Sequence, residues 1–248
     1  MRSEQTNSLA EKVSLKPFLT ATRRAFPAGY SDVLLIQASY DPAFYRDSLF
    51  TDYALPFPSH LSKAVAKRRA EYLASRLCVR EALRPFGFAN FVLANDADRA
   101  PIWPTGIVGS LSHTRACVSL LLAKSSSGKL LGVDCEEIMR PETAAGMRDM
   151  IINANEEAVL ACSGLPFATA LTAAFSLKES LYKALFPVFR QFMHFNEAEI
   201  VACEANLASV TLRLTRALST EFAVGRLFTG RVTLQEKQLT SWIVTPRA

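Results

Sequence analysis

The sequence predicts an α+β fold built from two halves. Each half is expected to hold one long amphipathic helix and several short apolar runs that are typical of antiparallel strands. The polar cluster at residues 125–128 lies almost at the midpoint of the 248 residues and is the clearest linker-like stretch. We therefore expect an N-terminal extension over residues 1–30, an N-terminal half over residues 31–126 and a C-terminal half over residues 127–248.

Both halves are expected to combine helices with antiparallel strands, an order that is compatible with a structural duplication, although the sequence itself shows no repeat. In the N-terminal half we expect a strand over residues 33–39, a basic helix over residues 61–83 that ends before Pro85 and Gly87, and strands over residues 107–111 and 116–124. The C-terminal half is expected to begin with a strand over residues 130–136. It continues with helices over residues 141–153, 155–162 and 166–185 and with strands over residues 198–203, 209–215, 225–235 and 241–245.

Composition excludes several classes of protein. The chain is 50% hydrophobic and 21% charged, which is typical of a globular protein and not of a disordered one. No apolar run approaches the roughly 18–20 residues that a membrane span needs, and the charged first 16 residues do not resemble a signal peptide. The five scattered cysteines form no C-x-x-C pair and fit a reducing compartment. We expect a cytoplasmic protein with no transmembrane segment.

Positive charge is concentrated in one segment. Residues 60–84 carry seven Lys and Arg against two Glu, a surplus equal to the net charge of +5 of the whole chain. Such a segment attracts nucleic acid, a phosphorylated small molecule or an acidic protein, although a solvated helix face is the plainer interpretation. Within the helix, Arg68 falls in the apolar stripe with Leu61 and Tyr72, so it needs a partner. That partner is either Glu71 or a bound phosphate.

The C-terminal half contains a candidate metal site. Asp134 and Glu136 end an apolar strand, and the period of two residues turns both side chains to one face. Two carboxylates on a rigid strand end suit a hard cation such as Mg²⁺, although such a pair also occurs at solvent-facing strand edges. The long helix adds Glu179, Lys178 and Lys183. An ordinary ion pair explains Glu179 and Lys183, whereas Lys178 lies on the apolar face and requires a buried anion.

His113 completes the set of residues that could take part in chemistry. It ends a strand directly after Ser112, a position that suits phosphate contact or proton transfer, although a single His is more often structural. No G-x-S-x-G motif, P-loop or Rossmann fingerprint is present. Three carboxylates, basic residues from two helices and one His together indicate Mg²⁺-assisted chemistry on a phosphate ester or anhydride.

A series of motifs spans about residues 60–195. They are Lys67-Arg68-Arg69-Ala70-Glu71-Tyr72-Leu73 with Arg76, Pro101-Ile102-Trp103-Pro104, Gly109-Ser110-Leu111-Ser112-His113, Gly132-Val133-Asp134-Cys135-Glu136 and Phe175-Ser176-Leu177-Lys178-Glu179-Ser180-Leu181-Tyr182-Lys183-Ala184. In these motifs and their order, the chain resembles the 4′-phosphopantetheinyl transferases of the siderophore-synthetase (enterobactin synthetase component D-like) type. The resemblance implies a pseudo-dimer of two similar α+β halves, with the active site between them.

The resemblance also implies roles for individual residues. Asp134, Glu136 and Glu179 are the implied ligands of Mg²⁺, with Mn²⁺ as an alternative. Coenzyme A is the implied co-substrate, held by Arg68, Arg76, Arg99, Ser112, His113, Lys178 and Lys183. Glu179, or a water held by the metal, is the implied general base, and Lys183 stabilises charge on the leaving diphosphate.

The implied reaction transfers 4′-phosphopantetheine from coenzyme A to a serine of an apo acyl, peptidyl or aryl carrier protein and releases adenosine 3′,5′-bisphosphate. A pathway for siderophores, other non-ribosomal peptides or polyketides is expected. Carrier domains are typically acidic, so a basic surface suits them, and no nucleic-acid partner is expected. We expect a monomer, because a pseudo-dimer supplies both halves of the site.

Two alternatives remain open at this point. A Mg²⁺-dependent nuclease or phosphodiesterase also uses a strand D-x-E with a nearby Glu and Lys. Against it, the usual nuclease places the lysine on the strand of the second acid, whereas Lys178 belongs to the helix. A protein that only binds RNA or DNA through the basic helix would leave the three carboxylates without a purpose.

Overall fold

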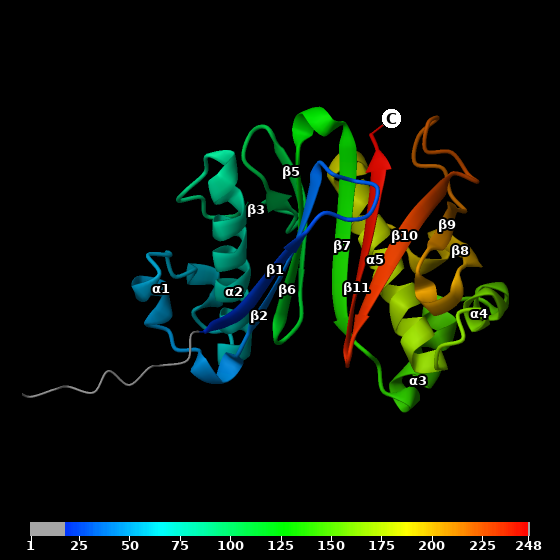
Figure 1. Cartoon of the computed structure of the whole chain (residues 1–248), viewed down its shortest axis with the longest axis horizontal. Coiled ribbons are helices and arrows are strands. Elements are labelled where there is room, and N and C mark those ends of the chain that lie inside the picture. The colour runs from blue at the N-terminus through cyan, green and yellow to red at the C-terminus, as the bar shows by residue number, and fades with distance from the viewer. Residues whose placement is uncertain (1–17, 248) are drawn as a thin grey trace, which may run out of the picture.

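The described residues form two large antiparallel sheets, each with one long helix on its outer face, and one two-stranded ribbon of β3 and β4 (Figure 1). The computed structural model describes residues 18–247. The elements of the N-terminal half are β1 (Leu19–Ala25), β2 (Val33–Tyr40), α1 (Leu49–Asp52), α2 (Ala66–Leu83), β3 (Ala94–Asn95), β4 (Pro101–Ile102), β5 (Ile107–His113) and β6 (Cys117–Lys124). Those of the C-terminal half are β7 (Lys129–Glu137), α3 (Pro141–Ile151), α4 (Ala154–Ala161), α5 (Phe167–Phe189), β8 (Ala198–Cys203), β9 (Val210–Leu214), β10 (Leu227–Gln235) and β11 (Gln238–Pro246).

Both halves follow one plan, which confirms the predicted α+β pseudo-dimer. The N-terminal sheet has the strand order β1-β2-β6-β5 and packs against α2, while the C-terminal sheet has the order β7-β11-β10-β9-β8 and packs against α5. In Figure 1 the two sheets lie side by side in the middle of the molecule, with α2 and α5 on the outside. Within residues 18–247, none of the helices has both the length and the apolar character that crossing a bilayer requires.

Strand β1 corrects the expectation of an irregular extension over residues 1–30. Its residues pair antiparallel with β2, for example Arg23 with Gln37, so the N-terminal sheet begins at Leu19. The strand lies at the sheet edge and is largely exposed along its length, which removes the alternation of apolar and polar residues by which strands are recognised. Residues 1–17 of the expected extension lie outside the described residues.

The two long helices differ from their predicted bounds at one end each. Helix α2 begins five residues later than expected, because Val65 is in an extended conformation and a short 3-10 turn over Ser59–Leu61 precedes it. Helix α5 continues past the predicted end, through Pro187, and stops at Arg190 in a left-handed conformation. Both ends border the pockets described below, so these differences affect the site.

The predicted linker at residues 125–128 is a tight turn. Ser125–Ser127 form one 3-10 turn and Gly128 has a φ of 62°, a left-handed conformation that glycine adopts without strain. The turn leads β6 of one sheet directly into β7 of the other. The division of the chain predicted from the sequence falls within this turn.

Three apolar clusters form the interior. One lies between α2 and the N-terminal sheet, and a second lies between α5 and the C-terminal sheet. The third lies between the sheets and contains Val33 and Leu121 from one half and Val133 and Trp242 from the other, together with neighbouring residues. The halves are thus joined through buried side chains as well as by the turn, and this junction fixes β5 beside β7.

Gly132 lets α5 lie directly on β7. A Cβ atom at this position would overlap the backbone carbonyl oxygen of Ser180 and would also crowd the backbone nitrogen of Ala184. Both obstacles are backbone atoms and cannot swing aside as a side chain could. The contact therefore requires glycine, and it brings the C-terminal part of α5 against the middle of β7.

Replacing Gly132 by alanine should destabilise the fold. Overpacking a dense interior costs about 1–3 kcal/mol, and a backbone obstacle places Gly132→Ala at the upper end, so we expect a loss of ~3 kcal/mol in the free energy of unfolding. Urea denaturation followed by circular dichroism measures this change.

Gly146→Ala is the matched control for this substitution. Gly146 lies on the exposed side of α3, and a Cβ added there would meet nothing within 4 Å. Alanine should therefore raise stability by ~0.5–1 kcal/mol through helix propensity. Equal stability of both variants would show that the contact between α5 and β7 does not depend on glycine.

Candidate active site

The end of β7 holds a buried carboxylate with unequal oxygens. Asp134 is 2% exposed, and its Oδ1 accepts hydrogen bonds from Ser112 Oγ (2.8 Å) and Lys183 Nζ (2.6 Å). Its Oδ2 is buried and has no hydrogen-bond partner among residues 18–247. Burying an unpaired carboxylate oxygen is costly, so this atom is oriented for a ligand that carries positive charge.

Two further carboxylates surround Asp134. Burial, followed by the charge of Asp134, raises the pKa of Glu136 to about 7. Burial also raises the pKa of Glu179, with Lys183 opposing the rise and Asp134 adding to it. Asp134 and Glu136 of β7 and Glu179 of α5, the helix that packs directly on β7, form one acidic cluster. In the described part of the chain, however, no three His, Cys, Asp or Glu side chains form a group that could hold a metal ion as they stand.

Lys183 provides the positive charge of this cluster. Burial opposes its charged form, but the charge of Asp134 and the hydrogen bond to it outweigh that effect and raise the pKa of Lys183. The ammonium group also donates to Ser112 Oγ at 3.1 Å. Lys183 thus links β5 of the N-terminal half to β7 of the C-terminal half.

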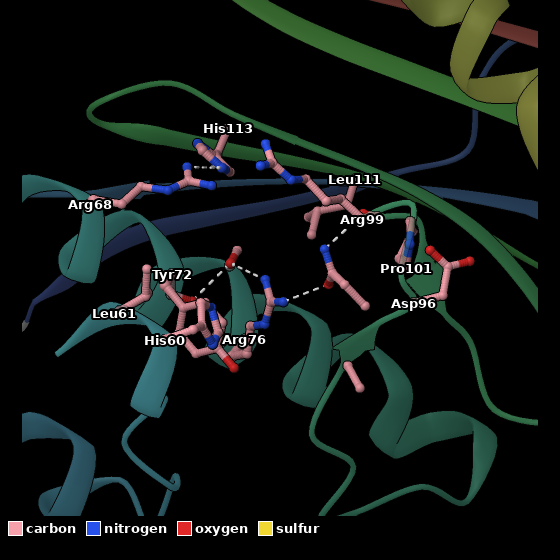
Figure 2. A pocket seen from close by; sticks show the side chains of 13 residues that line it. His60, Leu61, Arg68, Tyr72, Arg76, Asp96, Arg99, Pro101, Leu111 and His113 are labelled. Carbon is pink, nitrogen blue, oxygen red and sulfur yellow. Dashed lines mark hydrogen bonds between the residues drawn. The ribbon is translucent and has the colours of Figure 1, made fainter. Parts of the chain in front are cut away.

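A basic pocket of about 780 Å³, which we call the α2 pocket, lies in the N-terminal half, next to the acidic cluster (Figure 2). Its wall residues come from α2, the turn before it, β3, β4 and β5, and they include His60, Arg68, Tyr72, Arg76, Asn95, Arg99 and His113. Figure 2 shows the guanidinium groups of Arg68 and Arg99 near the ring of His113. The adjacent residue, Ser112, contacts Asp134, so the pocket adjoins the acidic cluster.

Arg68 pairs with Glu71, one of its two expected partners, and remains accessible to the other, a bound phosphate. Its side chain is 56% exposed, which corrects the prediction that it lies in the buried stripe of α2. It donates to Glu71 Oε2 at 3.1 Å and lies 3.3 Å from His113 Nε2. Burial lowers the pKa of His113. The ion pair therefore leaves the rest of the guanidinium facing the pocket.

Arg76 is more deeply placed than the sequence predicts. It is 8% exposed and donates to Leu93 O (3.1 Å), Ser75 Oγ (3.1 Å) and Asn95 Oδ1 (2.8 Å). Its guanidinium stacks on the Tyr72 ring, 4.0 Å from the centroid. These contacts make Arg76 a support for the pocket wall around Asn95, although it still lines the pocket.

The structure corrects the expectation for Lys178. Its Nζ donates to Ile151 O (2.7 Å) and Phe195 O (2.9 Å) and pairs with Glu156 Oε1 at 2.6 Å. The side chain is buried in the C-terminal half, and these three bonds occupy the three ammonium protons. The buried anion that the sequence required for Lys178 is Glu156 and not a phosphate.

A second pocket, the α5 pocket, also borders the acidic cluster. It has a volume of about 790 Å³, and Glu179 forms part of its wall. Met150, Tyr182 and Phe192 give it an apolar lining, and Met150 and Phe192 are more than half exposed. The acidic cluster is thus bordered by a basic pocket and by a largely apolar one.

Sequence reasoning missed the residues that act through tertiary contacts. Glu156 could be placed at a helix start, because Asn153 and Glu156 form a capping box, but nothing in the sequence pairs it with Lys178. Asn95 carries no motif, and neither does Phe192, which follows the predicted end of the long helix. Glu71 was identified as a partner of Arg68, but its position 3.9 Å from His113 was not.

Comparisons with known proteins agree with the layout of two halves. Residues 57–123 match the family model for the 4′-phosphopantetheinyl transferase N-terminal domain, and residues 130–236 match that for the 4′-phosphopantetheinyl transferase superfamily. The two matches cover the α2 pocket, the acidic cluster and the α5 pocket.

Curated relatives carry names from the same family. Enterobactin synthase component D of Salmonella typhimurium strain LT2 is 37% identical over 189 residues, which cover 75% of this chain and 76% of that protein. Its counterpart in Escherichia coli strain K12 is 41% identical over 147 residues, 58% of this chain and 67% of that one. The 4′-phosphopantetheinyl transferase Svp of Streptomyces mobaraensis is 31% identical over 175 residues, covering 68% and 70% of the two chains. Together with the two family models, these relatives show that the chain belongs to the 4′-phosphopantetheinyl transferase superfamily.

Proposed function

We propose that this protein transfers 4′-phosphopantetheine from coenzyme A to a serine of an apo carrier protein. The observation that carries the proposal is the order of three sites: a basic pocket, an acidic cluster and an apolar pocket. Coenzyme A has the same order of parts, with an anionic 3′-phosphoadenosine, a diphosphate and an uncharged arm. This match and the family favour the transferase over a nuclease or phosphodiesterase.

The α2 pocket suits the 3′-phosphoadenosine end. Arg68, Arg99 and His113 offer donors on one side of it, and a guanidinium matches phosphate oxygens with two parallel hydrogen bonds. Arg76 holds the wall around Asn95 in place. Ser112 and Lys183 lie where this pocket meets the acidic cluster, in position for the diphosphate.

The α5 pocket suits the pantetheine arm, which extends from the phosphate that is transferred. Met150, Tyr182 and Phe192 provide apolar and aromatic surface directly beyond Glu179. The arm carries amides and methyl groups but no charge, so it gains from such a lining without the cost of burying an ion.

The carboxylates fit a divalent cation. Asp134 Oδ2 is buried without a partner, and the raised pKa values of Glu136 and Glu179 reflect burial beside other negative charges. Hard oxygen ligands of this kind suit Mg²⁺, or Mn²⁺, and we propose that Asp134, Glu136 and Glu179 hold it. When bound, the cation neutralises negative charge on the diphosphate.

The reaction follows from the placement of Glu179 and Lys183. The carrier serine Oγ attacks the phosphorus that bears pantetheine, and the bond from this phosphorus to the oxygen of the adenosine 5′-phosphate breaks. Glu179, or a water held by the cation, takes the serine proton as general base. Lys183 stabilises the charge that develops on the leaving adenosine 3′,5′-bisphosphate. The net charge of +5 suits an acidic carrier domain, of a siderophore synthetase or a related assembly line.

The direct test is carrier loading. Incubation of this protein with coenzyme A, Mg²⁺ and an apo aryl or peptidyl carrier domain should add one phosphopantetheine to the carrier, as measured by mass spectrometry. Chelation with EDTA should abolish the gain, and added Mg²⁺ should restore it. No gain with any aryl, peptidyl or acyl carrier domain would contradict the proposal.

Removing the charge of Glu179 should prevent efficient carrier loading without weakening the binding of a ligand in the α2 pocket. We expect Glu179→Gln to lower kcat by about 10²–10⁴-fold, as loss of a general base does. The affinity for adenosine 3′,5′-bisphosphate, measured by calorimetry, should stay near the wild-type value. Glu137→Gln is the control, because this neighbouring carboxylate is half exposed and pairs with Arg115 at 3.8 Å. Wild-type loading by Glu179→Gln would rule out its catalytic role.

Phe192→Ala should weaken binding in the α5 pocket and leave binding in the α2 pocket unchanged. Loss of one aromatic contact of about 1 kcal/mol predicts a roughly fivefold higher KM for coenzyme A. Adenosine 3′,5′-bisphosphate lacks the arm, so its Kd should not change. Phe26→Ala is the control, because its ring is 64% exposed, as against 65% for Phe192, and lines neither pocket. Equal weakening of both ligands by Phe192→Ala would place the arm elsewhere.

A further inference from the structure

The loop over residues 96–100, which joins β3 to β4, forms one wall of the α2 pocket. It carries Arg99, which has a φ of 67° and whose side chain reaches toward His113 (Figure 2). Asn95 Nδ2 donates to the Arg99 carbonyl oxygen at 2.8 Å. Asp96 Oδ1 accepts from the backbone N–H groups of Asp98 (3.0 Å) and Ala100 (2.9 Å). The side chains of Asn95 and Asp96 therefore set the shape of the loop and the direction of Arg99.

Each of these two side chains is held by an arginine, one from each half of the molecule. Arg76 of α2 donates to Asn95 Oδ1 at 2.8 Å. Arg190, which follows the last residue of α5, pairs with Asp96 Oδ2 and lies 3.6 Å from Asp98 Oδ2. The residues that line the α2 pocket all belong to the N-terminal half, and Arg190 is a point at which the C-terminal half contacts the pocket wall.

The backbone of Arg190 is in a conformation that favours glycine. Its φ is 51°, and its N–H donates to Phe186 O to close the end of α5. A non-glycine residue in this region stores strain, which surrounding contacts must offset. Asp96 provides one such contact, and the Phe186 ring, 5.4 Å from the guanidinium, provides another. Arginine therefore gives up the conformational advantage of glycine at this position and gains an ion pair between the halves.

We propose that Arg190 is a positioning residue for coenzyme A, acting through Asp96 on the loop that carries Arg99. This inference rests on the proposed function. Arg190 lies two residues before Phe192, so the same short segment borders the α5 pocket and anchors the wall of the α2 pocket. The ion pair between Arg190 and Asp96 holds the walls of the two pockets in a fixed position relative to each other, which a ligand that occupies both pockets requires.

Arg190→Gly tests the proposal without straining the fold. Glycine suits the left-handed helix end, so thermal stability should be unchanged or slightly higher. Loss of an exposed ion pair predicts a rise of about 2–5-fold in KM for coenzyme A and in Kd for adenosine 3′,5′-bisphosphate, with kcat unchanged. Arg190→Lys keeps the charge and should recover part of the affinity. High salt should reduce the difference between wild type and Arg190→Gly.

A double-mutant cycle identifies the partner. Asp96→Asn keeps an oxygen for the loop N–H groups but removes the charge, so it should reproduce the effect of Arg190→Gly, and the double variant should add nothing further. The control is Arg213→Ala, because Arg213 has the same 48% side-chain exposure as Arg190 and pairs with Glu199 at 2.6 Å, away from the α2 pocket. That variant should leave both constants unchanged.

Three outcomes would overturn the proposal: unchanged affinity for both ligands in Arg190→Gly, a fall in kcat alone, or additive effects of Arg190→Gly and Asp96→Asn. Failure of the wild-type protein to load any carrier would instead contradict the proposed function. In that case the affinity for adenosine 3′,5′-bisphosphate still decides whether Arg190 positions the pocket wall, because this measurement requires no transfer.

Discussion

The close approach of α5 to β7 at Gly132 is the constraint on which the candidate site depends. The backbone of a helix is normally kept away from the strand that it covers by the side chains packed between them. Here the carbonyl of Ser180 occupies the space that a Cβ of residue 132 would need, so helix and strand backbones touch. Because of that contact, Asp134 of the strand and Glu179 and Lys183 of the helix can share one acidic cluster. A larger residue at position 132 would push the helix away from the strand. It would thereby separate Asp134 from Glu179 and Lys183 without altering these residues themselves.

Two lysines of α5 show how placement decides role. Lys178 and Lys183 are five residues apart, which turns them about 140° from each other around the helix. Lys178 faces α4, the end of α3 and the turn before β8, all in its own half. There it pairs with Glu156 and donates to two backbone carbonyls in the buried interior. Lys183 faces the junction of the halves and shares its proton donors between Asp134 and Ser112. A buried ion pair such as the first is weak evidence for stability but strongly resists removal of one partner.

The sequence predicts what local pattern determines. The strand that ends at Asp134 and Glu136 and the helix that carries Glu179 have strong periodicity, and both occur as expected. Strand β1 lacks a buried face and so lacks the pattern. The burial of Arg76, the bond from Ser112 to Asp134 and the pairing of Lys178 all join segments distant in sequence. From residue types alone, each of these groups could bind a phosphate. The packing shows which of them contact protein partners instead.

The same packing leaves a buried carboxylate oxygen, Asp134 Oδ2, without a partner at the junction. Ser119 and Gln37 of the N-terminal sheet both reach Thr240 of the C-terminal sheet, whereas Trp242 Nε1 and Asp134 Oδ2 have no hydrogen-bond partner among residues 18–247. An unpaired carboxylate oxygen is the costlier of these two atoms to bury. A molecule can retain such a cost where a ligand offsets it on binding. Any cation or ligand that binds these oxygens only in the folded state must then stabilise the junction by mass action. Because Ser112 and Asp134 belong to different halves, that stabilisation includes the contact that joins the halves at the site.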